Sequence, residues 1–140
     1  MYLIERTNFG LHLTFGGVIL EPEMNVWLDE MTKIVDEIPG DFLVFVDMRT
    51  IGPVPHDAQL VLEKGQKYAQ ENGMVRSVVI LSDSLTRMQF TRIAKKSGIY
   101  EWERYIDVST TDEWEKKGLD WILDCVDPDT YETEQVIEHK

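Results

Sequence analysis

The best candidate site in this sequence is formed by the polar residues that follow two apolar runs, Phe42–Val46 and Val75–Leu81. They are Asp47, Arg49, His56, Asp57, Ser82, Asp83, Ser84 and Arg87. Two arginines in such a set could hold an anion against the start of a helix, where exposed N–H groups already favour negative charge. In the simpler interpretation, which we favour, Ser82 or Asp83 caps a helix and Arg49 pairs with a carboxylate.

Other patterns that would indicate catalysis or metal binding are weak. The three histidines are far apart in the sequence, and none has the His-Glu-x-x-His spacing of a zinc site. His12 falls on the polar side of an alternating strand and is expected to be exposed. Cys125 lies at helical spacing from Trp121, which predicts a buried, inert thiol. The acidic residues from Asp127 onward have no glycine-pivoted calcium loop and are expected to be solvated. We therefore predict no catalytic residue, no metal site and no cofactor.

The hydrophobic pattern alternates between strand and helix periods, which predicts a single α/β domain. Strands are expected at 2–5, 10–15, 42–46, 75–81 and 104–108. Helices are expected at about 22–38 and 57–72, from the capping run 82–84 to Gly98, and from 110 onward. This order predicts a mixed, mostly parallel sheet of four or five strands with about four helices and right-handed crossovers. The continuous apolar run Phe42–Val46 is expected to be the central strand, parallel to its neighbours and covered on both faces.

Three details of the helices follow from the same pattern. Leu85, Met88 and Ile93 are expected to form the buried face of the third helix. Thr110 and Glu113 have the spacing of a capping box at the start of the last helix. Trp102 is expected in a loop, where it either anchors a partner, as aromatic residues often do at interfaces, or covers the core. We expect residues 1–124 to form the domain and residues 125–140 to form an acidic C-terminal tail.

The composition is strongly acidic, with 14 Lys and Arg residues against 26 Asp and Glu residues and a formal net charge of −12. Such a charge argues against nucleic-acid binding and against acidic membranes. It would attract a cationic partner, but we favour the simpler interpretation that it serves solubility alone. The single cysteine excludes an intrachain disulfide and a metal site with several thiolates. No apolar run approaches the roughly 20 residues needed to cross a bilayer, and charge follows Met1 too soon for a signal peptide. A cytoplasmic location is therefore expected.

Three stretches of the sequence resemble the STAS domain family of anti-sigma-factor antagonists and sulfate-transporter domains, and most closely its SpoIIAA-like subgroup. They are the strand entering Asp47-Met48-Arg49, the stretch Val78-Val79-Ile80-Leu81-Ser82-Asp83-Ser84, and the ending from Tyr105-Ile106-Asp107-Val108 through Glu113-Trp114 to Leu119-Asp120-Trp121-Ile122. The resemblance implies a STAS-like βαβ sandwich. It also implies a regulatory role through protein contact, or a lipid-binding role, because the subgroup is placed with Sec14-type domains.

One departure from the family pattern concerns phosphorylation. The antagonists carry a phosphorylatable serine in an Asp-Ser-Ser-Gly-like run where the helix after the central strand begins. This sequence reads Val54-Pro55-His56-Asp57-Ala58 there and has no hydroxyl residue. Asp57 supplies a fixed negative charge at about the same point, so the switch is expected to be absent or permanently set.

Three functions remain open from the sequence. The first is a non-catalytic binding or regulatory module that acts through protein–protein contact, alone or as a homodimer. The second is an apolar-ligand or lipid-binding domain, and the third is a small hydrolase or transferase with a site at the carboxyl ends of the strands. The candidate contact residues are Arg49, His56, Asp57, Ser82, Ser84, Arg87 and Trp102. An apolar cavity would favour the second function, and an exposed apolar patch would favour the first.

Overall fold

The computed structural model describes residues 1–129, which contain five strands and four α-helices. The strands are β1 (Tyr2–Arg6), β2 (Gly10–Gly17), β3 (Phe42–Ile51), β4 (Met74–Leu81) and β5 (Glu103–Asp107). The helices are α1 (Glu21–Glu37), α2 (His56–Glu71), α3 (Ser84–Ser97) and α4 (Trp114–Asp124), with a short 3-10 turn, η1 (Ile99–Glu101). Within the described residues, no helix is both long enough and apolar enough to cross a membrane.

The strands form one sheet in the order β1-β2-β3-β4-β5. β1 runs antiparallel to β2, and the other three pairings are parallel. The predicted α/β class and mixed, mostly parallel sheet are therefore confirmed. β3 lies at the centre with a parallel neighbour on each side, as its continuous apolar run predicts.

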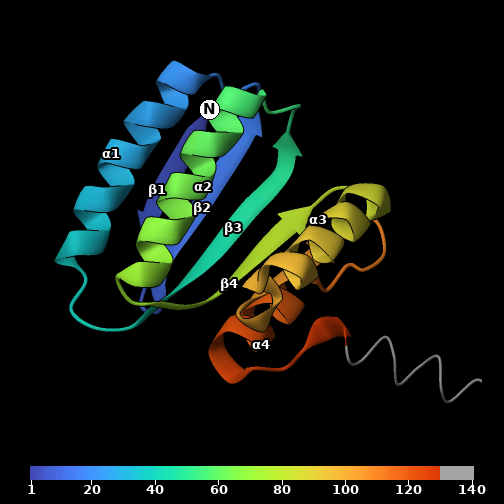
Figure 1. Ribbon diagram of the computed structural model, residues 1–140. Helices are drawn as coiled ribbons and strands as arrows, with labels where there is room; N and C mark the ends of the chain where they lie inside the picture. The colour runs from blue at the N-terminus through green and yellow to red at the C-terminus, as the bar shows by residue number, and fades with distance from the viewer. Residues whose placement is uncertain (130–140) are drawn as a thin grey trace, which may run out of the picture.

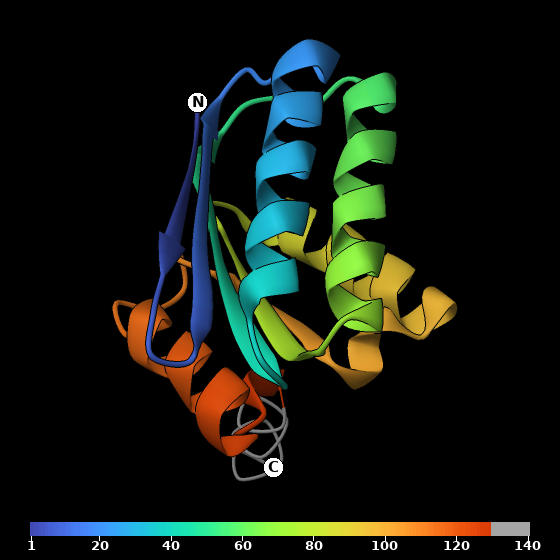
Figure 2. The same cartoon turned by 90° about the vertical axis from the view of Figure 1, so that its left-hand side faces the viewer.

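Helices cover both faces of the sheet (Figures 1 and 2). Figure 2 shows α1 and α2 on one face and α4 on the other. The larger core cluster lies under α1 and α2 and includes Phe15, Trp27 and Val44. The smaller cluster lies under α4 and includes Phe45, Val78 and Trp121. Phe45 and Val44 are neighbours in β3 that point to opposite faces, so the central strand joins the two clusters.

Close packing of α1 against α2 depends on a glycine. A Cβ atom added to Gly65 in α2 would lie 2.3 Å from Cη2 of Trp27 in α1. On the other face, a Cβ atom on Gly118 in α4 would lie 2.7 Å from Cε2 of Phe45. Both glycines therefore let a helix approach an aromatic ring that no larger residue would permit.

The last helix differs from the sequence prediction at both ends. α4 begins at Trp114, and the predicted capping box does not form: the Thr110 hydroxyl donates to the backbone of Asp107 instead. Cys125 is exposed, so the expectation of a buried thiol was wrong. The helix ends at Asp124, and Cys125 turns into the left-handed region (φ 57°), which carries its side chain off the apolar face.

His12 is also less exposed than expected. Its imidazole stacks on the ring of Phe45, with 5.1 Å between ring centroids and 10° between planes. Its Nδ1 lies 3.6 Å from the Glu5 carboxylate on the neighbouring strand. His12 therefore covers part of the smaller core cluster, because its ring stacks on Phe45 of that cluster.

The segment after α4 is held against β5, η1 and α3. The Asp127 carboxylate accepts hydrogen bonds from Nε and Nη2 of Arg104 at 2.9 and 3.1 Å. Asp129 accepts from Nη2 of Arg87 at 2.6 Å and from the Tyr100 hydroxyl at 2.5 Å. The expectation that Asp127 and Asp129 are solvated was therefore wrong; the rest of the predicted acidic tail lies outside the described residues.

Candidate functional site

At the carboxyl end of β3, Asp47 and Arg49 form a local pair. Asp47 accepts hydrogen bonds from Nε and Nη2 of Arg49 at 3.0 and 2.9 Å, and from the Arg49 backbone N–H at 3.0 Å. The guanidinium also lies 4.2 Å from the ring centre of Trp114. Burial alone would raise the pKa of Asp47, but the hydrogen bonds and charge of Arg49 outweigh it and lower that pKa. The simpler predicted role of Arg49, pairing with a carboxylate, is the one observed.

His56 and Asp57 are the first two residues of α2, and both are exposed. Asp57 accepts a hydrogen bond from the backbone N–H of Ala58 at 2.8 Å. The N-cap is Pro55, which offers no side-chain hydrogen bond. The negative charge of Asp57 therefore does lie at a helix start, where the helix dipole favours it.

At the start of α3, the predicted capping residue is in place. Asp83 accepts from the backbone N–H of Thr86 at 2.7 Å and from its hydroxyl at 2.9 Å. Ser82, the alternative cap, is exposed. Asp83 is therefore the N-cap, which typically stabilises a helix by about 1 kcal/mol.

Ser84 contacts a carboxylate that sequence reasoning did not single out. Its hydroxyl donates to Asp107, the last residue of β5, which is 1% exposed and also accepts from the backbone N–H and hydroxyl of Ser109. Burial would raise the pKa of Asp107, but the hydrogen bonds from Ser84 and Ser109 outweigh it and lower the pKa. A lowered pKa makes a carboxylate a weaker general base toward a serine hydroxyl.

Arg87 and Trp102 have structural contacts as well. Arg87 donates through Nε to the backbone carbonyl of Tyr105 at 3.0 Å, in addition to its contact with Asp129. Trp102 is half-buried and packs against the larger core cluster. Of the two roles left open for Trp102, covering the core is the one this position supports.

The predicted site residues therefore separate into local groups. Arg49 lies with Asp47 and Trp114 beside α4, and His56 and Asp57 begin α2. Ser84 and Arg87 join α3 to β5 and to the segment after α4. Among residues 1–129, no group of three or more His, Cys, Asp or Glu side chains is placed to hold a metal ion.

Sequence reasoning missed a polar network inside the core. Glu103 is 3% exposed, and its carboxylate accepts from the Ser77 hydroxyl at 2.6 Å, the Tyr105 hydroxyl at 2.5 Å and Nε2 of Gln66 at 3.0 Å. Burial raises the pKa of Glu103, although the three hydrogen bonds oppose that effect. The alternation of Glu103 with Tyr105 was the available signal, because it places both side chains on one face of β5.

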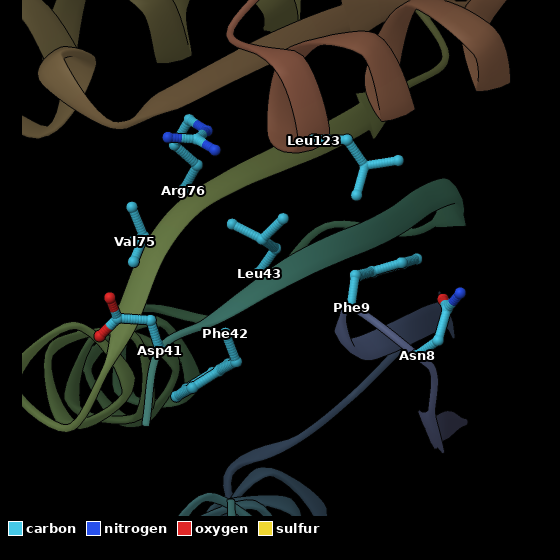
Figure 3. Close-up of a pocket in the computed structure, with 8 residues that line it drawn as sticks. All are labelled: Asn8, Phe9, Asp41, Phe42, Leu43, Val75, Arg76 and Leu123. Carbon is cyan, nitrogen blue, oxygen red and sulfur yellow. The ribbon is translucent and has the colours of Figure 1, made fainter. Parts of the chain in front are cut away.

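Surface hollows lie at the amino edge of the sheet and on α3. The first lies at the amino edge of the sheet, opposite the predicted site, and has a volume of about 510 Å³ (Figure 3). It is lined by Asn8, Phe9, Asp41, Phe42, Leu43, Val75, Arg76 and Leu123. It is open to solvent, whereas small-molecule sites typically enclose most of their ligand. Its shape therefore does not favour the apolar-ligand hypothesis.

The second hollow lies on α3 and has a volume of about 530 Å³. It is lined by Met88, Thr91, Arg92, Lys95 and Lys96. This side of α3 faces away from the sheet, because the helix turns Ala94 into the larger core cluster. Phe90 contributes an edge-to-face contact with Tyr105, 5.7 Å between ring centroids.

The predicted buried face of α3 is exposed. Leu85, Met88 and Ile93 are 65%, 63% and 62% exposed, so the expectation that they pack inward was wrong. The small side chain of Ala94 and the aliphatic stem of Arg87 face the sheet in their place. We name Leu85, Met88, Arg92, Ile93, Lys95 and Lys96 the outward face of α3.

Comparison with known proteins gives a fold and no family assignment. The sequence matches no protein-family model and no curated protein. Among solved structures, the chain is similar to an uncharacterized protein of the DUF3478 family with a SpoIIAA-like fold from Shewanella loihica PV-4. The TM-score is 0.62 at 16% sequence identity, and the match covers 87% of this chain and 92% of that chain. The chain therefore has the SpoIIAA-like fold that the sequence resemblance predicted.

Proposed function

We propose that this protein is a non-catalytic binding module that contacts another protein through the outward face of α3. One observation carries the proposal: Leu85, Met88 and Ile93 expose more than half of their surface on a single helix. Exposing three large apolar side chains there costs solubility, and such a patch is typical of an interaction site.

The way α3 is held supports the same proposal. Asp83 caps its first turn, Ser84 donates to the buried Asp107, and Arg87 binds the backbone of β5. These contacts fix the helix before any partner arrives, so little conformational entropy is lost on binding. In this role, the predicted contact residues Ser84 and Arg87 act by positioning α3.

The chemistry of the strand ends favours binding over catalysis. The lowered pKa of Asp107 makes it a poor base for Ser84, and Asp47 is neutralised by Arg49. His56 is exposed at the start of α2, and within residues 1–129 no hydrogen bond or ion pair orients its ring. A hydrolase or transferase would need a nucleophile and a base held in hydrogen-bond reach of each other.

Site-specific photo-cross-linking tests the proposal. A photoreactive amino acid at the exposed position Gln89, in the middle of α3, should capture a protein partner in cells. The matched control carries the same group at Asn25, an exposed polar position on α1. Products at Asn25 but not at Gln89 would contradict the proposal.

The captured partner then provides a quantitative test. With purified proteins, Met88→Ala and Ile93→Ala should each weaken binding about tenfold, because each removes an apolar side chain from the contact. Val26→Ala, which truncates a side chain 51% exposed on α1, should leave the affinity unchanged. Unchanged affinity in both α3 variants would reject α3 as the contact surface.

A further inference from the structure

The charge of α3 is opposite to that of the rest of the chain. Four of the 14 basic residues lie in α3, at Arg87, Arg92, Lys95 and Lys96, and none of the 26 acidic residues does. Within residues 1–129, Arg92, Lys95 and Lys96 form no ion pair with a carboxylate, whereas Arg87 is engaged by Asp129. The outward face therefore carries three cations on an otherwise acidic molecule.

These cations are interleaved with the apolar side chains. At 100° per residue, Leu85, Arg92 and Lys96 fall along one line of the helix, with Met88 and Ile93 on either side of it. The hollow of about 530 Å³ joins Met88 to Arg92, Lys95 and Lys96. A matching surface must present carboxylates and apolar side chains in alternation, as one side of an amphipathic helix does.

Two other occupants fit less well. A second copy of the chain that used its own α3 would bring two sets of cations together, and like charges at an interface oppose association. An anionic membrane or nucleic acid is an extended surface and would also meet the acidic remainder of a chain with net charge −12. A short segment avoids this repulsion, because charges beyond about 8 Å are screened at physiological salt.

We infer that the partner docks an acidic, amphipathic protein segment on the outward face of α3. This inference rests on the proposed function and specifies the partner. The net charge of the whole molecule, which favours a cationic partner at long range, does not decide the contact. Over the few ångströms of an interface, the cations of α3 decide which charge the partner presents.

A series of three peptides tests the inference. Each peptide is labelled with fluorescein, has 18 residues and forms a helix with leucines along one face. The remaining positions are all Glu in the first peptide, all Gln in the second and all Lys in the third. In fluorescence polarisation with the full chain, the Glu peptide should bind at least tenfold tighter than the Gln peptide, and the Lys peptide should not bind. Added salt should weaken the binding of the Glu peptide and leave the binding of the Gln peptide unchanged.

Charge reversal locates the site. The double variant Arg92→Glu with Lys96→Glu should bind the Glu peptide at least tenfold more weakly than the wild-type chain does. The matched control, Lys33→Glu with Lys64→Glu, makes the same change in net charge at exposed positions on α1 and α2 and should have no such effect. Circular dichroism should show that both variants are folded.

Each contrary outcome has a separate meaning. Equal binding of the Glu and Gln peptides, or no binding of any peptide, would overturn the inference but leave the cross-linking test of the proposed function standing. Binding to phosphatidylserine vesicles that is lost in Arg92→Glu with Lys96→Glu would overturn it in favour of a membrane. Equal losses in the α3 double variant and its control would show general repulsion and would also overturn it.

Discussion

Glu103 has its carboxylate inside the core, where three donors from three elements surround it. Ser77 comes from β4, Tyr105 from β5 and Gln66 from α2. None of the three is a cation, so the negative charge is satisfied by hydrogen bonds without a counter-ion. Burial without a counter-ion disfavours the ionised form of Glu103, and this is why its pKa is raised.

Glu103→Gln should stabilise the protein at neutral pH by about 1 kcal/mol or more, because it removes a carboxyl group whose ionised form burial penalises and keeps the side-chain shape. The amide oxygen can still accept from Ser77 and Gln66, and the amide NH2 can donate to the Tyr105 hydroxyl once that hydroxyl turns to accept. The sign of the pH dependence follows from the raised pKa. The folded state binds a proton on Glu103 before the unfolded state does, so wild-type stability rises as pH falls toward the unfolded pKa of about 4.5. Urea unfolding between pH 5 and 8 should show this rise, and the rise should be smaller in Glu103→Gln.

Two comparisons make the result specific to Glu103. Glu101→Gln changes an exposed carboxylate two residues away and should alter neither stability nor its pH dependence. The carboxyls of Asp47 and Asp107, whose pKa values are lowered, stay ionised in both states above pH 5 and add no slope there. If Glu103→Gln is less stable than wild type at pH 7, the carboxylate is a net stabilising group and the argument fails.

Contacts between near neighbours in the sequence were predictable at this scale. Asp83 caps α3 by accepting from the backbone N–H of Thr86, three positions along the chain. Arg49 pairs with Asp47, two positions away. The bonds of Glu103 to Ser77 and Gln66 span 26 and 37 residues. Such contacts depend on which strands become neighbours, and the residue types alone carry no sign of it.

At the scale of elements, Gly65 controls how closely α1 and α2 approach. Ala is the better helix former by about 1 kcal/mol, which alone would favour Gly65→Ala. The added Cβ would lie 2.3 Å from Cη2 and 2.5 Å from Cζ3 of Trp27, well inside contact distance. Trp27 is 2% exposed and cannot move away freely. We expect a net loss of about 2 kcal/mol in the free energy of unfolding.

A double-mutant cycle identifies the clash as the cause. Both atoms that Cβ meets belong to the six-membered ring of the indole, so Trp27→Phe should remove much of the conflict. The effects of Gly65→Ala and Trp27→Phe, measured by urea unfolding, should then be less than additive. Gly52→Ala is the control, because a Cβ there meets its nearest atom at 3.4 Å. Full additivity of the two substitutions would show that the helices are not limited by this contact.

The helical spacing of apolar residues coincides with the buried face of α1, but it predicted the buried face of α3 incorrectly. Met24, Trp27, Met31 and Val35 are buried as their spacing indicates. Within residues 1–129, no element covers Leu85, Met88 or Ile93 of α3, and the helix packs on the sheet through Ala94 and Phe90. A periodic pattern indicates that a face is apolar, but it does not show whether this chain or another one covers that face.

At the scale of the whole molecule, charge is distributed unevenly between its parts. The sequence established a net charge of −12, and α3 is a basic surface within it. The acidic residues after α4 also do more than solubilise the chain. Asp127 and Asp129 cross to Arg104 and Arg87 and connect the end of α4 with the far edge of the sheet.

The pair between Asp127 and Arg104 is the part of this connection closest to the core. The Arg104 side chain is 9% exposed, and its guanidinium lies 3.6 Å from the ring centre of Tyr100 and 4.3 Å from that of Trp121. Removing the carboxylate would leave a largely buried cation without its bidentate partner. The rings attract the cation, but a ring face supplies no hydrogen-bond acceptor in the plane of the guanidinium.

Asp127→Asn should therefore lower the free energy of unfolding by about 2 kcal/mol, the typical contribution of hydrogen bonds to a charged group. Asp120→Asn is the matched control, because it breaks the exposed pair with Lys116 and should cost less than about 0.5 kcal/mol. Urea unfolding followed by tryptophan fluorescence measures both, since Trp121 lies against the guanidinium. High salt should reduce the small effect of Asp120→Asn more than the effect of Asp127→Asn, because a buried pair is poorly screened. If the two variants lose equal stability, the segment after α4 is held no more firmly than an ordinary surface ion pair would hold it.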